Sequence, residues 1–145
     1  GFLEEQPGLG TVRDLLSSKS GSIVSARPSM RVREVVDTLK SLGISQLPVL
    51  DGERLLGIVH EVDLLRHLVS GSGTLDSVIK DLIESDYATV TPDTKIELLQ
   101  SVLNEAKVAL VLDTGKMVGL VSKIDLIAYL ADRPQPTLPS SPPGV

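Results

Sequence analysis

The stretch "GLVSKID" at residues 119–125 places a hydroxyl and a carboxylate three residues apart, where an apolar strand pattern runs into a helical one. If residues 117–121 form a strand and residues 124–130 a helix, Ser122 is the N-cap and Asp125 the third helical residue. The first turn of a helix has unpaired N–H groups and a partial positive charge. One interpretation is therefore a capping box, in which Ser122 caps the helix and Asp125 reaches back to it.

The second interpretation of this stretch is a polyol and anion site. The Asp125 carboxylate would accept hydrogen bonds from a ribose diol, while the helical N–H groups and the Ser122 hydroxyl would face a phosphate or another polar group. Gly119 would let the backbone approach a ligand, or would simply allow a bulge. The residues alone leave both interpretations open.

Nearly the same pattern, "GIVHEVD", stands at residues 57–63, which points to an internal repeat. Four pairs of residues recur, 62 positions apart for the first two and 64 for the others: Asp63 with Asp125, Gly57 with Gly119, Pro28 with Pro92, and Leu39 with Leu103. The second copy has therefore lost two residues between Leu103 and Gly119. Two units of about sixty residues follow from this spacing.

Each unit shows the same order of elements. A short helix (residues 11–17 and 75–84) is followed by a strand, "SIVSA" or "ATVT", and then by an amphipathic helix. Two strands follow, joined by the turns "DGER" (51–54) and "DTGK" (113–116), which are hairpin signals. A last helix begins at the Ser/His–Asp motif, and the order β-α-β-β-α is thus written twice.

These patterns predict an α/β fold of the α+β type, in which two β-α-β-β-α units pack sheet to sheet with pseudo-twofold symmetry. A sixty-residue unit alone would make a marginal core, so a shared core is expected, with grooves between the units. The expected division is an N-terminal linker (1–10), a first unit (11–69), a linker (70–74), a second unit (75–131) and a proline-rich tail (132–145).

Composition narrows the classes of function. Hydrophobic residues make up 41% of the 145 residues, enough for a packed interior. With one Phe, two Tyr, no Trp and a net charge of −5, a nucleic-acid partner is not expected. The absence of cysteine excludes disulfides and thiolate metal sites, and no apolar run reaches the length of a membrane span, so a cytoplasmic location is expected.

Catalytic and metal sites find little support in the sequence. His60 and His67 lie seven residues apart without a third ligand at helical spacing, which favours surface or cap roles over a metal site. Ser122, His60 and Asp63 could be combined into a triad, but nothing like a nucleophile elbow accompanies them. No glycine-rich phosphate loop is present. We therefore expect no catalytic residues, no metal site and no enzymatic turnover.

The segments "GISQLPVLDGERLLGIVHEVDLL" and "VALVLDTGKMVGLVSKIDLI" resemble a tandem pair of CBS domains, the adenosine-ligand-sensing modules attached to many enzymes and channels. The resemblance covers about residues 11–131. More narrowly, "GFLEEQPGLGTVRDLL" and "SKIDLIAYLA" resemble the C-terminal regulatory module found behind the pyridoxal-phosphate domain of cystathionine β-synthases. It implies a regulatory module without a cofactor of its own, an attached effector domain, and a homodimer built on Leu64, Leu65, Leu68, Leu126, Ile127 and Leu130.

The resemblance also implies two ligand clefts, each combining the aspartate motif of one unit with the strand before the hairpin of the other. Asp125 would hold the ribose and Ser122 a ribose or phosphate oxygen, while aliphatic side chains sandwich adenine. The main cleft would comprise Val24, Ser25, Ile44, Ser45, Gln46, Leu47, Val121, Ser122, Ile124 and Asp125.

The second cleft departs from the family pattern, because His60 replaces the hydroxyl residue and the two-residue loss falls in its lining. Its implied residues are His60, Asp63, Val90, Thr91, Val108 and Ala109. The expected ligands are S-adenosylmethionine first, then AMP, ADP or ATP, since only Lys123 adjoins the Asp125 motif and a triphosphate would find little to hold it. The alternative is a structural or oligomerising module that has lost ligand binding.

Overall fold

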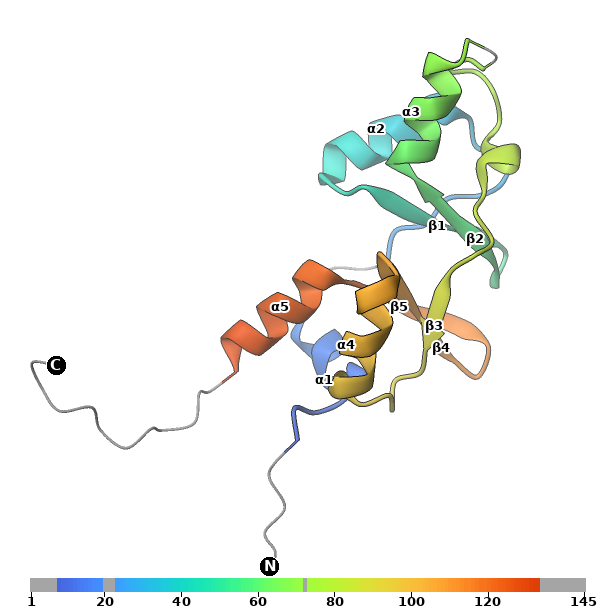
Figure 1. The fold of residues 1–145 in the computed structure, drawn as a ribbon. Helices are drawn as coiled ribbons and strands as arrows, with labels where there is room; N and C mark the ends of the chain where they lie inside the picture. Colours follow the sequence, from blue (N-terminus) through green and yellow to red (C-terminus); the bar gives the residue numbers. More distant parts are fainter. Residues whose placement is uncertain (1–7, 20–22, 72, 134–145) are drawn as a thin grey trace, which may run out of the picture.

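Two small sheets with helices on their outer sides make up the part of the chain that the computed structural model describes, residues 8–19, 23–71 and 73–133. The first sheet pairs β1 (Gln46–Asp51) with β2 (Arg54–His60) and is covered by α2 (Val32–Leu42) and α3 (Glu61–Val69). The second sheet has the order β3 (Ala88–Val90), β4 (Val108–Asp113), β5 (Lys116–Ser122). The helices α4 (Ile96–Glu105) and α5 (Lys123–Asp132) lie beside it (Figure 1).

The two hairpins share one geometry. β1 and β2 pair antiparallel with a register shift after Val49, opposite Gly57, and β4 and β5 do the same after Val111, opposite Gly119. In both, the chain then enters a helix directly, at α3 or α5. The repeat expected from the sequence is therefore present as a structural repeat.

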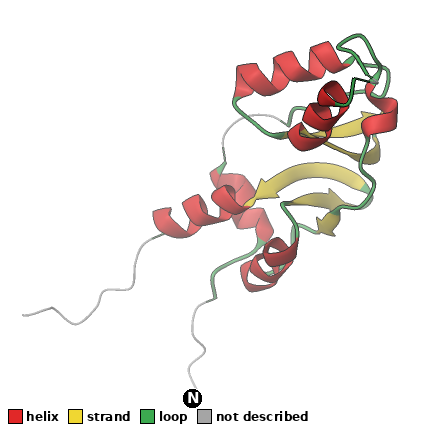
Figure 2. Cartoon of the chain, turned by 45° about the horizontal axis from the view of Figure 1, so that its top comes forward, coloured by secondary structure: helices red, strands yellow, loops and turns green. Residues whose placement is uncertain are grey.

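The sheets face each other and the helices lie outside them, as Figure 2 shows. A small cluster fills the space between the sheets: Ile58 of β2 packs with Val108 and Leu110 of β4. Leu55, Tyr87, Met117 and Leu120 complete it. The mixed fold with two units packed sheet to sheet is confirmed.

The opening helix of each unit packs on the other unit. The helix α1 (Val12–Ser18) buries Val12 and Leu15 in the core formed by α4, α5 and the second sheet. Conversely the 3₁₀ helix η1 (Ile79–Leu82) buries Ile79 in the core formed by α2, α3 and the first sheet. In Figure 1 the blue α1 accordingly lies between the orange and red helices of the second unit.

Matching backbone hydrogen bonds fix this exchange. Val12 N–H donates to the Thr94 carbonyl at 2.8 Å and Ile96 N–H to the Gly10 carbonyl at 3.0 Å. At the equivalent place, Ile79 N–H donates to Met30 at 2.9 Å and Val32 N–H to Ser77 at 2.8 Å. The period of the repeat predicts each opening helix within its own unit, and the exchange corrects that prediction.

Two expected elements are smaller in the structure. The helix predicted over residues 75–84 is reduced to the single 3₁₀ turn of η1. The strand predicted for "SIVSA" is reduced to one bridge, in which Ala26 pairs in parallel with Val49. The predicted tail lies almost wholly outside the described residues. Within the described ranges, no helix is both long and apolar enough to cross a membrane.

Candidate functional site

The Ser122–Asp125 motif forms the capping box that its spacing predicts. The Ser122 N–H and hydroxyl both donate to Oδ2 of Asp125, at 2.9 and 3.0 Å, and Asp125 N–H donates to the Ser122 hydroxyl at 3.4 Å. Asp125 nevertheless lines an open cleft. The capping role and the position expected of a ligand-binding carboxylate therefore coexist in one side chain.

A third donor to this carboxylate comes from Lys19, the C-cap residue of α1. Its ammonium group donates to Oδ2 of Asp125 at 3.0 Å and to the Leu120 carbonyl at 2.8 Å. Burial raises the pKa of Asp125, but the Ser122 N–H, the hydrogen bond and charge of Lys19, and the Ser122 hydroxyl together hold it below its ordinary value. Asp125 is therefore a charged acceptor at neutral pH.

The cleft around Asp125 has a volume of about 750 Å³ and is shared by the two units. Of the residues predicted for it, these line the cleft: Val24, Ile44, Ser45, Gln46, Ser122, Ile124 and Asp125. Leu47 and Val121 do not, since they are 1% and 0% exposed in the cores of the first and second unit. Successive residues of a strand face opposite sides of the sheet, so the strand neighbours of the lining residues point into the core and away from the cleft. Ser25 is half-buried and also lies outside the lining.

The cleft is more basic than the sequence indicated. Lys19, Lys107 and Lys123 all line it, against the single carboxylate of Asp125 among the described residues. The expectation that only Lys123 adjoins the motif is therefore wrong. Lys19 lies 106 positions from Asp125 and reaches it only because α1 packs on the second unit, which no local pattern reveals.

The second cleft, of about 600 Å³, lies around Asp63 and is lined by His60 and Val108 as expected. Three other predicted residues do not line it. Val90 and Ala109 are buried in the core of the second unit, and Thr91 forms a turn in which its N–H donates to the Thr94 hydroxyl at 3.0 Å.

The motif at the second cleft lacks the tight cap of the first. No side-chain capping bond is found at His60, and Asp63 accepts only a 3.4 Å contact from Arg66. Within the described residues, Oδ2 of Asp63 is buried and has no hydrogen-bond partner. Asp63 therefore lacks the multiple donors that hold Asp125 in the first cleft.

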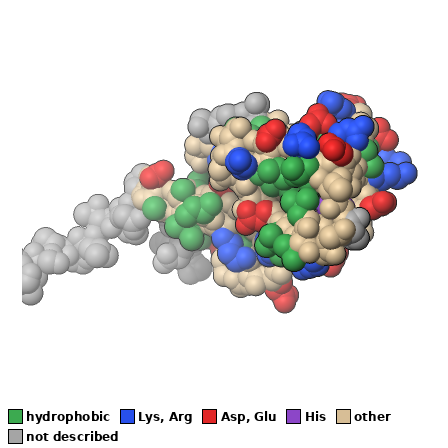
Figure 3. Space-filling model, turned by 90° about the horizontal axis from the view of Figure 1, so that it is seen from above, with side chains coloured by type: hydrophobic (Ala, Val, Ile, Leu, Met, Phe, Trp, Pro, Cys, Tyr) green, Lys and Arg blue, Asp and Glu red, His purple; other side chains and the backbone are tan. Residues whose placement is uncertain are grey.

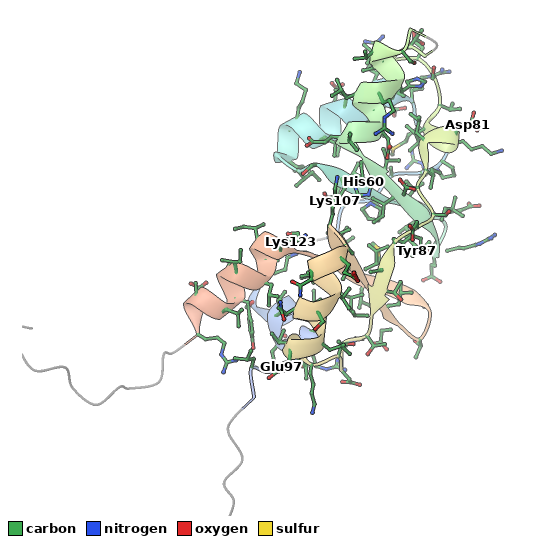
Figure 4. All side chains as sticks on the ribbon, in the orientation of Figure 1. His60, Asp81, Tyr87, Glu97, Lys107 and Lys123 are labelled. Atoms are coloured by element: carbon green, nitrogen blue, oxygen red, sulfur yellow. The ribbon has the colours of Figure 1, made fainter. Side chains whose placement is uncertain are left out.

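The two clefts differ in charge. Among the described residues, the cations that line the second cleft are Arg66 and Lys107. Its lining also has four carboxylates: Asp63, Glu84, Asp86 and Glu105. Lys107 lines both clefts, and Figure 4 shows it close to His60 where the units meet. An anionic ligand is thus favoured by the first cleft and disfavoured by the second.

The shortened connection predicted for the second unit is present. In the first unit, α2 is followed by three residues before β1, with Gly43 in a left-handed conformation. In the second, α4 is one residue shorter and only Ala106 and Lys107 separate it from β4. Lys107 consequently stands where the first unit has Ser45, directly before the strand.

The glycines of the two motifs are explained by the exchanged segments. A Cβ on Gly119 would lie 2.6 Å from Cδ2 of Leu16, which follows Leu15 on α1. A Cβ on Gly57 would collide with the Glu84 carbonyl, just after η1. Gly119 also lines the first cleft, beside the predicted bulge. A larger residue at position 119 would force the Leu16 side chain of α1 to move.

Comparison with known proteins decides the family. A model described as the CBS domain matches residues 11–70 and again residues 79–132. The chain belongs to the CBS domain family. The CBS domains occur as a pair, which agrees with the structural repeat and with the resemblance noted from the sequence.

Proteins with several different names are similar in sequence or structure to this chain. Cystathionine β-synthase of Dictyostelium discoideum is 27% identical over 133 residues, covering 88% of this chain and 26% of that protein. A crystal structure of the CBS domain protein NE2398 superposes with a TM-score of 0.77 at 27% identity, covering 84% of this chain and 98% of that one. The CBSX2 protein, solved with AMP, has a TM-score of 0.70 at 21% identity, covering 84% and 96%. The chain spans between 13% and 36% of the length of the curated relatives it matches.

Proposed function

We propose that this CBS pair is a regulatory module that binds a phosphate-bearing adenosine ligand in the first cleft and controls an attached domain. The observation that carries the proposal is the convergence of one charged carboxylate, Asp125, with three lysines in a cleft between the two units. A volume of about 750 Å³ lies within the usual range for small-molecule sites.

Each part of the ligand has a complementary group. Adenine would lie between the aliphatic side chains of Val24, Ile44 and Ile124, which line the cleft. The ribose diol would donate to the Asp125 carboxylate. The phosphate would lie against the ammonium groups of Lys107 and Lys123, where charge-assisted hydrogen bonds are strong.

The lysines change the order of expected ligands. S-adenosylmethionine has a sulfonium, an ammonium and a carboxylate group and is a net cation, which three lysines disfavour, whereas AMP carries a phosphate that they attract. AMP therefore comes before S-adenosylmethionine for the first cleft. The AMP bound by CBSX2 supports this choice at the level of a shared fold.

The domain under control is part of the proposal. The likeness to cystathionine β-synthase supports an attached pyridoxal-phosphate enzyme, with this chain as its regulatory region. Regulation would come from a ligand that binds one arrangement of the pair more tightly than another, because only differential affinity shifts an equilibrium. The cytoplasmic location expected from the sequence stays a prediction.

Self-association into a homodimer is the second part of the proposal. Leu65, Leu68 and Ile127 are 61%, 37% and 58% exposed, and Ile124 adds 66%, so α3 and α5 present apolar side chains to solvent. Leu64 and Leu126 are buried inside the pair and Leu130 packs against its core, which removes them from the expected interface. Figure 3 shows hydrophobic side chains gathered on one face of the surface.

One observation favours the alternative of a structural module. Oδ2 of Asp125 already accepts three hydrogen bonds, from Ser122 twice and from Lys19. In the structural alternative, the sole role of this carboxylate is to cap α5 and to hold α1. Thermal melting with AMP, ADP, ATP, S-adenosylmethionine and adenosine separates the two. A rise in the melting temperature with AMP supports the sensor, and no rise with any of the five supports the structural module.

A further inference from the structure

The helices α1 and α5 run antiparallel from the first cleft to the chain that enters the module. α1 packs against α5 through Leu15 and Leu16, which share a core cluster with Leu126, Tyr129 and Leu130. At one end of this pair lies Asp125 in the first turn of α5, and at the other end lies the segment Gly8–Gly10 before α1. Figure 1 shows this pair beside α4 at the base of the molecule.

At the cleft end, the two helices are joined by Lys19. Its ammonium group spans the Leu120 carbonyl and the Asp125 carboxylate, and the two side chains of the ion pair are only 33% and 25% exposed. Because the Lys19 ammonium already donates to the Asp125 carboxylate, it competes with the hydroxyl groups of a ligand for that carboxylate.

At the far end, α5 and α4 hold the entering segment. The Tyr129 hydroxyl donates to the Leu9 carbonyl at 2.7 Å, and the Arg133 guanidinium lies over the Tyr129 ring and donates to the Gly8 carbonyl at 3.4 Å. From α4, Glu97 accepts a 3.4 Å hydrogen bond from Leu9 N–H. The path of the chain into the module therefore depends on where α5 lies relative to α1.

We propose that a ligand in the first cleft displaces Lys19 from Asp125 and thereby loosens the attachment of residues 8–13 to α4 and α5. The hydroxyl groups of a diol compete with Lys19 for Oδ2 of Asp125, and a phosphate attracts the lysine away from the carboxylate. Either interaction removes the tie at the cleft end of the helix pair. The ligand arm of this inference rests on the proposed function, whereas the role of Lys19 can be tested without any ligand.

Hydrogen exchange on the whole chain tests the inference. The amides of Leu9, Val12 and Arg13 donate to Glu97, Thr94 and Pro92, so the peptide covering residues 8–16 reports on the attachment. A partly exposed ion pair is worth up to about 1 kcal/mol, so Lys19→Met should speed exchange in this peptide about two- to fivefold without ligand. Saturating AMP should do the same to the wild type and add nothing to Lys19→Met.

Lys116→Met is the matched control, because it removes a lysine from a surface ion pair with Glu53 and lies outside both clefts. It should leave exchange in residues 8–16 unchanged. Peptides from α2 and β1 serve as an internal reference, and Lys19→Gln repeats the test with a polar side chain. An increase spread equally over the reference peptides is general destabilisation and overturns the inference.

The remaining outcomes separate the two proposals. If calorimetry shows that AMP binds and exchange in residues 8–16 does not change, the inference is wrong and the proposed function stands. If none of AMP, ADP and ATP binds the wild type, the proposed function fails. In that case Lys19→Met alone tests whether the Lys19–Asp125 ion pair holds residues 8–13 in place. If this variant exchanges in residues 8–16 at the wild-type rate, the inference is wrong.

Discussion

The Lys19 ammonium lies 3.0 Å from Oδ2 of Asp125, although the two residues are 106 positions apart in the chain. The contact joins the C-cap residue of the exchanged helix α1 to the first turn of α5, inside the first cleft. It makes the candidate ligand-binding carboxylate part of the packing between the two units. The proposed ligand site and the proposed coupling to the entering segment therefore both include this ion pair.

Acid should weaken the module through Asp125. Its pKa in the folded state lies below the ordinary value of 3.8, so its stabilising contribution is complete above about pH 4 and is lost as the pH falls through the lower folded value. Asp125→Asn should lower the free energy of unfolding by about 1–2 kcal/mol at pH 7, and the deficit should shrink towards pH 3. Chemical denaturation at several pH values measures this.

The control for that experiment is Asp76→Asn, which breaks the exposed ion pair with Arg33. It should change the free energy of unfolding by a few tenths of a kcal/mol at most. A deficit for Asp125→Asn that stays constant from pH 7 to pH 3 would count against the ionised carboxylate as its cause.

The exchanged helix should carry much of the stability of the second unit. Leu15 is fully buried in the core cluster beside α4 and α5, so Leu15→Ala should cost about 2–5 kcal/mol. Leu98→Ala, on the exposed side of α4, should stay within about 0.5 kcal/mol of the wild type. Equal effects of the two substitutions would show that α1 does not pack as described.

A fragment should fold when it contains the complete core seen in the structure, and not when it is cut at the boundary of the sequence repeat. A fragment of residues 1–72 keeps α1 without its partners and lacks Ile79, so we expect it to be insoluble or molten. A fragment of residues 19–85 contains every buried member of the first core and should show more native-like structure. Circular dichroism during thermal melting compares them, and a cooperative, soluble 1–72 fragment would contradict this prediction.

The sequence was sufficient for the architecture and for the motif. The spacing of Ser122 and Asp125, repeated as His60 and Asp63, placed both helix starts correctly, and the two Gly-containing turns placed both hairpins. These features are local, because caps and turns depend on neighbouring residues.

What the sequence did not reveal depends on distant contacts. The period of the repeat assigns α1 to the first unit, yet its apolar face is buried by α4 and α5 of the second unit. Lys19 reaches Asp125 because of this packing. Leu47 and Val121 were assigned to the cleft from the family resemblance, as part of the strand before the hairpin and of the aspartate motif. Because side chains alternate along a strand, both residues point into the cores, and only the register of the strand shows which side chains do so.

Self-association should depend on the exposed apolar side chains of α3 and α5. We expect the wild type to sediment as a dimer at micromolar concentration, and Leu65→Glu together with Ile127→Glu to shift it to monomer. Leu98→Glu, equally exposed on α4, is the control and should leave the dimer intact. A wild type that sediments only as monomer would exclude this interface.

Isothermal titration calorimetry with AMP on Asp125→Ala and Asp63→Ala tests the central claim most directly. Hydrogen bonds to a charged group contribute about 1.5–3 kcal/mol each, so Asp125→Ala should weaken binding about ten- to a hundredfold or more. Asp63→Ala should retain most of the affinity, because its acidic cleft disfavours a phosphate. Binding that survives in Asp125→Ala and disappears in Asp63→Ala would show that the second cleft, not the first, is the ligand site.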